Sequence, residues 1–261
     1  MIATLTTLAT GAVTGLIIST TGVGGGVIVL PILAYLYGMN ALMAVATANL
    51  LSMLMKITSS WLHYRLGNIP LKRAMIVIGI MLPATFGASL LVSYLASVPA
   101  WQTTVNQTIN LLVVAAILFS LWLFIRRMFF CPPLPPADAS DPISVRALLL
   151  PGIAAGIVLG ATGVGGGIVV LPMLLRYAKM DIKQAIGTSI FVTTLLSGSS
   201  AIAYMQDGHT DVSLALWLFA GSLISMPLTK ILLIRMPDRA FQYATLVLIL
   251  CSAVMMILKL F

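Results

Sequence analysis

The stretch TTGVGGGVIVLP, residues 20–31, places four glycines within five positions of an apolar run and follows them with a proline. Glycine and proline both weaken helices, yet the surrounding sequence is typical of a membrane helix. The chain repeats this break at residues 161–172, which read ATGVGGGIVVLP. The recurrence indicates that the interruption is part of the fold and not an accident in one span.

The composition predicts a polytopic membrane protein. The 261 residues are 60% hydrophobic and 8% charged, with no Glu, whereas soluble domains carry about 25% charged residues. The net charge of +8 is typical of loops rich in Lys and Arg on the cytoplasmic side of a membrane, so we expect the lipid bilayer and not nucleic acid as a partner. Cys131 and Cys251 form no C-x-x-C pair, and the first positive residue is Lys56, so neither a disulfide nor a cleaved signal peptide is expected.

The lengths of the apolar stretches separate full spans from shorter segments. A transmembrane helix needs about 20 residues, and the stretches of sufficient length are 41–64, 73–95, 108–125, 184–205, 212–234 and 240–260. Stretch 2–19 is borderline, and those too short to cross alone are 27–37, 147–160 and 168–178. The short stretches flank the two glycine runs.

The two halves of the chain align without a gap at an offset of 141 residues. Thr21 to Gly26 match Thr162 to Gly167, and further matched pairs are Gly11/Gly152, Gly15/Gly156, Pro31/Pro172, Met39/Met180, Thr47/Thr188, Ser59/Ser200 and Gly67/Gly208. This duplication is a common transporter plan. We expect a first repeat at 1–130, a cytoplasmic linker rich in Pro and Asp at 131–145, and a second repeat at 146–261.

The distribution of positive charge predicts that the repeats are inverted. If each glycine region enters and leaves on one side, a single face holds Arg65, Lys72, Arg73, Arg126, Arg127, Arg146, Arg176, Lys179, Lys183, Lys230, Arg235 and Arg239, and the other holds Lys259. If each glycine region instead crosses the membrane once, seven of these positive residues lie on one face and six on the other, so no bias remains. The positive-inside rule favours the first arrangement. The predicted fold is therefore an all-α polytopic membrane protein with two inverted repeats. Each is a glycine-tipped re-entrant hairpin plus three transmembrane helices, and both termini are outside.

In this arrangement the hairpin tips enter from opposite faces and meet near the midplane. Free N–H groups at the start of the second hairpin arm suit an anion, and glycine lets a ligand approach the backbone closely. The arm begins either at the glycines or at the proline. The substrate-binding residues predicted from the tips are Thr21, Gly24, Gly25, Gly26, Thr162, Gly165, Gly166 and Gly167. For Gly11, Gly15, Gly152 and Gly156 we expect close helix packing.

Polar residues within the following spans extend the candidate site. Thr47, Asn49, Thr188 and Ser189 are candidate pocket donors, although a hydroxyl can also bond its own helix backbone. Lys56 is the one charge well inside a span, and it either attracts an anion or snorkels to the interface. His63 and Arg65 belong to the cytoplasmic mouth or to interface anchoring. No span holds Asp or Glu and no catalytic or metal-ligand cluster is present, so we expect no enzyme activity and no cofactor.

The twin GVGGG-x-x-x-x-P runs at 22–31 and 163–172 resemble those of the TauE/SafE family of sulfite and sulfonate exporters. AVATANL at 44–50 and AIGTSIF at 185–191 follow the runs as they do in that family, and His63 with the Gly67 turn is also similar. The resemblance implies a bacterial inner-membrane carrier for small sulfur-containing anions such as sulfite, sulfoacetate or other organosulfonates, usually exporting them. The resemblance also implies coupling to protons. Because no span holds a carboxylate, a proton path through side chains is not expected, and a weak acid carrying its own proton, or a uniporter, would need none.

The hypothesis from the sequence is an alternating-access carrier for small oxyanions with its site between the two hairpin tips. An anion channel and a non-transporting membrane scaffold are the alternatives. A carrier is expected to show transport that accelerates when substrate is present on the far side of the membrane, whereas a channel conducts steadily. A scaffold is expected to give no anion flux.

Overall fold

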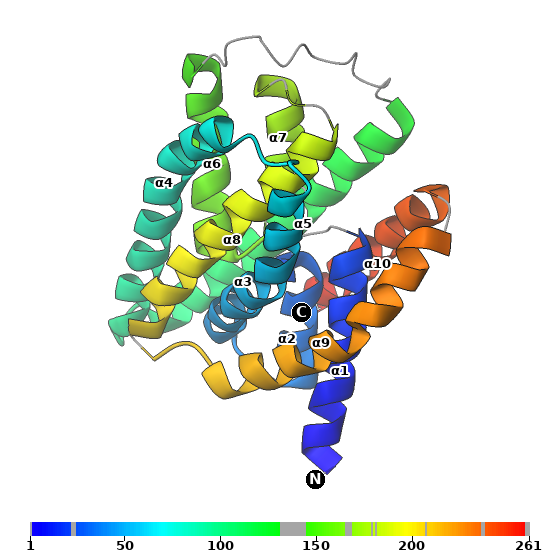
Figure 1. Ribbon diagram of the computed structural model, residues 1–261. Helices are drawn as coiled ribbons and strands as arrows, with labels where there is room; N and C mark the ends of the chain where they lie inside the picture. Colours follow the sequence, from blue (N-terminus) through cyan, green and yellow to red (C-terminus); the bar gives the residue numbers. More distant parts are fainter. Residues whose placement is uncertain are drawn as a thin grey trace.

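The computed structural model describes residues 2–21, 25–130, 145–164, 169–178, 180, 182–206, 208–235 and 238–258 (Figure 1). Within these ranges every regular element is a helix. The helices are α1 (Ile2–Thr21), α2 (Gly25–Leu36), α3 (Ala41–Arg65), α4 (Leu71–Ser97), α5 (Gln102–Phe130), α6 (Val145–Thr162), α7 (Val170–Tyr177), α8 (Ile182–Gln206), α9 (Val212–Arg235) and α10 (Asp238–Leu258). Five of them are long and apolar enough to cross a membrane. The predicted all-α polytopic class is confirmed at this level.

Most of the candidate spans lie where the apolar stretches predict them. Four are Ala41–Arg65, Leu71–Ser97, Gln102–Arg126 and Gln184–Gln206. The fifth, Val145–Thr162, shows that the expectation for stretch 147–160 was wrong, since this helix is long enough to cross. It includes Gly160, which packs closely on the backbone of α4 at Thr85. Helices α9 and α10 cover the remaining two stretches, with apolar parts at Val212–Ser225 and Leu246–Leu258 among the described side chains.

Local backbone geometry repeats at the offset seen in the sequence. Helices α3 and α8 both end at a glycine in the left-handed region, Gly67 and Gly208, each with φ of 72°. Asn68 N–H bonds to His63 O at 3.0 Å, and the matching His209 N–H bonds to Tyr204 O at 3.2 Å. This is the helix-ending motif that glycine stabilises, because a left-handed residue without Cβ carries no steric penalty. The two halves therefore form the same turn.

The helix contacts are reciprocal between the halves. Helix α1 packs on α9 as α6 packs on α4, and α3 contacts α9 as α8 contacts α4 (Figure 1). Helices α3 and α8 occupy equivalent places and pack against each other. Gly187 of α8 lies against His63, and Gly198 lies against Met53. Residue numbers rise on one helix as they fall on the other, so α3 and α8 run antiparallel.

The glycines of α1 and α6 serve close packing, as predicted. A Cβ at Gly11 would meet the backbone of Leu218, and one at Gly15 would meet Ser222. On α6, a Cβ at Gly152 would lie 2.9 Å from Ile80 Cγ2, and one at Gly156 would lie 2.8 Å from Met81 O. Small residues allow such contacts between membrane helices, where van der Waals packing replaces the hydrophobic effect as the main attraction.

Two buried apolar clusters hold the bundle together. One lies around α2, α3 and α5 and includes Leu30, Leu51 and Val113. The other joins α4, α6, α7 and α8 through residues such as Met81, Leu174 and Leu196. Val164, the second residue after the end of α6, belongs to the first cluster. The second glycine run thus places one of its residues in the core of the first half.

Candidate functional site

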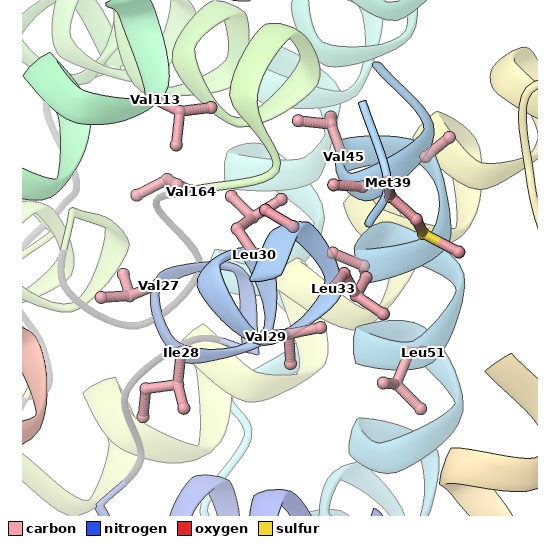
Figure 2. Close-up of a cluster of buried hydrophobic side chains, with 14 of the residues drawn as sticks. Val27, Ile28, Val29, Leu30, Leu33, Met39, Val45, Leu51, Val113 and Val164 are labelled. Carbon is pink, nitrogen blue, oxygen red and sulfur yellow. The ribbon is translucent and has the colours of Figure 1, made fainter. Parts of the chain in front are cut away.

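The two glycine runs touch each other. A Cβ at Gly26, in the first turn of α2, would meet the carbonyl oxygen of Gly163, with the Gly163 carbonyl carbon at 2.7 Å and Val164 N at 3.1 Å. Gly163 itself has φ of 66°, a conformation that favours glycine. Figure 2 shows Val164 beside Val27 and Leu30 of α2, with Val113 on its other side. Only glycine at position 26 allows this approach.

The sequence left open whether the helix after each glycine run begins at the glycines or at the proline. In the first copy, helix α2 begins at the glycines. Gly25 is its first residue and Pro31 lies inside it. In the second copy α7 begins at Val170, two residues before Pro172. Pro31 has no N–H for the carbonyl of Val27, four residues earlier. The Ser252 hydroxyl of α10 donates to that oxygen instead, so the proline is accommodated by a bond from a distant helix.

Asn49 lies directly beside the second glycine run. A Cβ at Gly163 would lie 3.3 Å from Asn49 Nδ2 and 3.6 Å from Val45 O. Asn49 Nδ2 donates to Val45 O at 3.0 Å, while the buried Oδ1 has no hydrogen-bond partner among the described residues. An unsatisfied buried acceptor costs about 1–3 kcal/mol. If the Asn49 amide were flipped, its Oδ1 would face the Val45 carbonyl oxygen, and both atoms are acceptors. Oδ1 is therefore the amide atom that remains available to a hydrogen-bond donor.

The predicted hydroxyl residues fall into two groups. Thr47 accepts a bond from Asp211 N–H at 3.1 Å, and Thr162 donates to Val158 O at 2.6 Å while accepting from Val164 N–H. These two hydroxyls therefore already hold the chain in place. Thr188 is fully buried, and its Oγ1 has no partner among the described residues. Ser189 is buried beside it on α8 and takes part in an interaction of its own.

The predicted cations lie along the second half of α3. Lys56 is 7% exposed and forms no ion pair with a described residue. His63 Nδ1 lies 3.4 Å from Asn68 Nδ2, at the turn between α3 and α4. Arg65 is exposed, with its guanidinium 5.0 Å from the centre of the Trp61 ring. Cation–π contact with an exposed tryptophan is typical of an interface anchor.

The remaining predicted site residues fall outside the described structure. Gly24, Gly165, Gly166 and Gly167 lie outside the described residues, as do residues 131–144 of the expected linker, whose last residue, Val145, begins α6. Thr21 ends α1, but its side chain is not among those described. The structure thus brings together Gly26 and Asn49 around Gly163, while Lys56 and His63 follow further along α3.

A groove of about 430 Å³ opens between α3 and α8, away from the glycine contact. Its walls are mostly apolar, with Ser60, Tyr64 and Thr194 as the hydroxyl residues among its lining. Ser60 lies one turn from Lys56 on α3. The groove therefore lies alongside the stretch of α3 that carries the buried cation.

One polar cluster was not predicted as such from the sequence. Ser89 on α4 donates to Gly160 O at 3.1 Å and contacts the Ser200 hydroxyl, and Tyr204 donates to Gly160 O at 2.8 Å. These bonds tie α4, α6 and α8 together just before the second tip. Ser200 was visible only as half of the matched pair Ser59/Ser200, because a partner on another helix leaves no local sequence pattern.

The contact between the runs combines two kinds of group. The first four N–H groups of a helix have no partner within that helix, so the start of α2 presents donors where Gly26 meets Gly163. Asn49, whose Nδ2 lies near Gly163, adds the buried acceptor Oδ1. No group of three His, Cys, Asp or Glu among the described residues is placed to hold a metal ion. The arrangement suits a small ligand that accepts several hydrogen bonds and donates one.

Comparison with known families decides the class of protein. The family model described as sulfite exporter TauE/SafE matches residues 7–256. The chain belongs to the TauE/SafE family. Its membership and its candidate spans make it a multi-pass membrane transporter, and the resemblance carried by the twin glycine runs is confirmed.

Individual relatives of the TauE/SafE type agree with this class. The chain is 27% identical to the probable membrane transporter protein YjnA of Bacillus subtilis, over 95% of this chain and 97% of that protein. It is 24% identical to the probable membrane transporter protein YdhB of the same organism, covering 80% and 82%. It is 29% identical to the probable membrane transporter protein MJ0441 of Methanocaldococcus jannaschii, covering 75% and 70%. No solved structure matches the chain.

Proposed function

We propose that this protein is a secondary carrier that moves a small sulfur-containing oxyanion, such as sulfite or sulfoacetate, out of the cell by alternating access. The observation that carries the proposal is the backbone contact between Gly26 and Gly163, which joins the two halves at their glycine runs. The sulfur chemistry and the export direction come from the description of the family, sulfite exporter.

The two halves are proposed to be inverted repeats. The antiparallel packing of α3 and α8 supports this, because repeats related by an axis along the membrane normal would place equivalent helices parallel. The contacts of Gly187 with His63 and of Gly198 with Met53 carry that observation. Inversion also gathers most of the basic residues on the cytoplasmic face, with both termini outside.

Each glycine region is proposed to be a re-entrant hairpin. On the α6–α7 side, Gly152 lies against Ile80 in the N-terminal half of α4, and Arg73 Nη1 in the first turn of α4 donates to Ala178 O at 3.3 Å just after α7. Both ends of this segment thus lie toward the N-terminal end of α4. Gly160, near the tip, packs further along α4 at Thr85. A segment that starts and ends at one end of α4 has the geometry of a hairpin.

The substrate chemistry follows from the groups at the tips. An anion accepts hydrogen bonds from the N–H groups at the start of α2, where the helix dipole also favours negative charge. Asn49 Oδ1 requires a donor in return. A singly protonated oxyanion satisfies both, and it brings its own proton into a membrane domain whose spans hold no carboxylate. Gly24, Gly165, Gly166, Gly167 and Thr188 complete the proposed site, while Thr47 and Thr162 position the chain around it.

Alternating access requires that the tips separate on one side at a time. The packed contact of Gly26 with Gly163 is then the closed arrangement between inward-open and outward-open states. Rigid movement of the α1–α2 segment against the α6–α7 segment opens a path on one face while the other stays shut. The bulk of the remaining bundle, held by the α3–α8 pair, stays fixed in this mechanism.

Flux through proteoliposomes tests the proposal against its alternatives. The purified protein is reconstituted, and uptake of radiolabelled sulfoacetate and sulfite is measured with and without unlabelled anion on the far side. A carrier gives saturable uptake that accelerates with substrate on the far side. Steady conduction without such acceleration identifies a channel, and the absence of flux for every anion tested leaves a scaffold.

A further inference from the structure

Helix α3 carries a line of polar side chains that begins at the glycine contact and extends well beyond it. Asn49, Ser52, Lys56, Ser60 and His63, here called the α3 polar face, are spaced by three or four residues. At 3.6 residues per turn they fall within an arc of about 80° and extend over about 21 Å. Four of them are less than 9% exposed, and His63 is partly buried.

The opposite side of α3 differs in exposure. Ile57, Thr58 and Trp61 are exposed, and Thr58 lies about 180° from Asn49 around the helix axis. In a membrane such a surface faces lipid. A helix that turns a buried polar side inward and an apolar side to lipid lines a path or a site within the bundle.

Both ends of the α3 polar face are fixed by contacts. Asn49 lies beside Gly163 at the second tip, and His63 lies beside Gly187 and Asn68 at the turn between α3 and α4. That turn carries the exposed basic side chains Arg65 and Lys72. The face thus connects the contact between the glycine runs with the most basic end of the bundle.

Lys56 lies midway along this face without a counter-charge. The one acidic side chain described, Asp211, accepts from Leu214 N–H at the start of α9. A buried ammonium without a partner is costly, and the described side chains around Lys56 offer it no carboxylate. We propose that the α3 polar face is the cytoplasmic half of the anion path, and that Lys56 pairs with the anion between the basic turn and the glycine tips.

The duplicated helix supplies an internal comparison. The residues of α8 that match the α3 polar face are Ile190, Thr193, Ser197, Ala201 and Tyr204, which include no cation. Tyr204 is occupied by its bond to Gly160 O. The two halves of the path therefore differ in charge, so the anion is expected to bind more tightly from the cytoplasmic side than from the outside.

Cysteine accessibility tests the path. In a background with Cys131→Ser and Cys251→Ser, Ser60→Cys is compared with Thr58→Cys using the membrane-impermeant anion 2-sulfonatoethyl methanethiosulfonate. Ser60→Cys is expected to react from the cytoplasmic face at least tenfold faster than Thr58→Cys, and sulfoacetate slows that reaction. Equal reactivity of the two variants, or reaction of Ser60→Cys from the outside alone, overturns the path.

The charge of Lys56 is tested by transport with each orientation of the protein. Lys56→Met is expected to raise KM at the cytoplasmic face about tenfold, Lys56→Arg to restore it, and Thr58→Met to leave it unchanged. The inference rests on the proposed carrier, but the two fail differently. If the wild-type protein gives no anion flux, the proposed carrier function is refuted. If the Lys56→Met variant transports the anion with an unchanged KM, only the proposed role of Lys56 is refuted.

Discussion

Replacing Gly26 by alanine adds one methyl group at the contact between the two halves. The new Cβ would meet the Gly163 carbonyl oxygen, with the carbonyl carbon at 2.7 Å and Val164 N at 3.1 Å. Carbon atoms in contact prefer about 3.5–4.0 Å, so the tips must move apart by about 1 Å. The neighbouring atoms are backbone and have no flexible side chain to yield.

The cost of such overpacking is about 1–3 kcal/mol. At 1.4 kcal/mol per factor of ten, the closed arrangement of the tips loses roughly 5- to 150-fold in population. Because an alternating-access carrier passes through that arrangement in every cycle, we expect the transport rate of Gly26→Ala to fall by about tenfold or more. Thermal unfolding of the purified protein should shift downward as well.

Gly79→Ala is the matched control. Gly79 also lies inside a helix, and a Cβ there meets nothing within 4 Å. Alanine in place of a helical glycine is favourable by about 1 kcal/mol, so this variant keeps wild-type flux and unfolds at the same temperature or higher. Initial rates of sulfoacetate uptake in proteoliposomes compare the two. Wild-type flux and stability in Gly26→Ala would refute the reasoning, because the tips would then not be in contact during transport.

Further variants test other parts of the structure. Ser252→Ala leaves Val27 O without its donor and lowers the free energy of unfolding by about 1–3 kcal/mol. Adding Pro31→Ala restores an N–H for that oxygen and recovers part of the loss. A double-mutant cycle that shows no coupling between the two substitutions contradicts this. Gly67→Ala and Gly208→Ala each cost about 1–2 kcal/mol because both glycines have φ of 72° in open space, and clearly unequal losses in chemical unfolding argue against equivalent turns. Thr47→Val removes the acceptor for Asp211 N–H, so it lowers stability by about 1 kcal/mol while KM for the anion stays unchanged; a raised KM at normal stability would return Thr47 to the substrate site.

The class of fold was predictable because it depends on composition and length. A chain that is 60% hydrophobic and 8% charged has no soluble alternative, and the 141-residue offset found in the sequence recurs in the backbone bonds of the Gly67 and Gly208 turns. The packing roles of Gly11 and Gly152 were also predictable, since small residues spaced by four create a groove on one helix face. The extent of α6 was not, because its end is stabilised by contact with Thr85 on α4.

The candidate site was predictable in outline only. The sequence indicated Gly26 and Asn49, because glycine runs and intramembrane amides are rare enough to be noticed. It did not indicate that Ser252 replaces the hydrogen bond lost at Pro31, since those residues are more than 200 positions apart. Hydroxyl side chains were the least predictable, as Thr162 and Thr188 look alike in sequence yet one is bonded at the helix end and the other has no partner among the described residues.

Inversion of the repeats is the central claim, and the sidedness of one matched pair of residues tests it most directly. Arg65 and Gln206 are exposed and lie at equivalent positions in the two halves. In a cysteine-free background, Arg65→Cys and Gln206→Cys are labelled with an impermeant thiol reagent in right-side-out and inside-out vesicles. Inverted repeats predict that Gln206→Cys reacts only from the outside and Arg65→Cys only from the cytoplasmic side. Labelling of both from the same side would contradict the account.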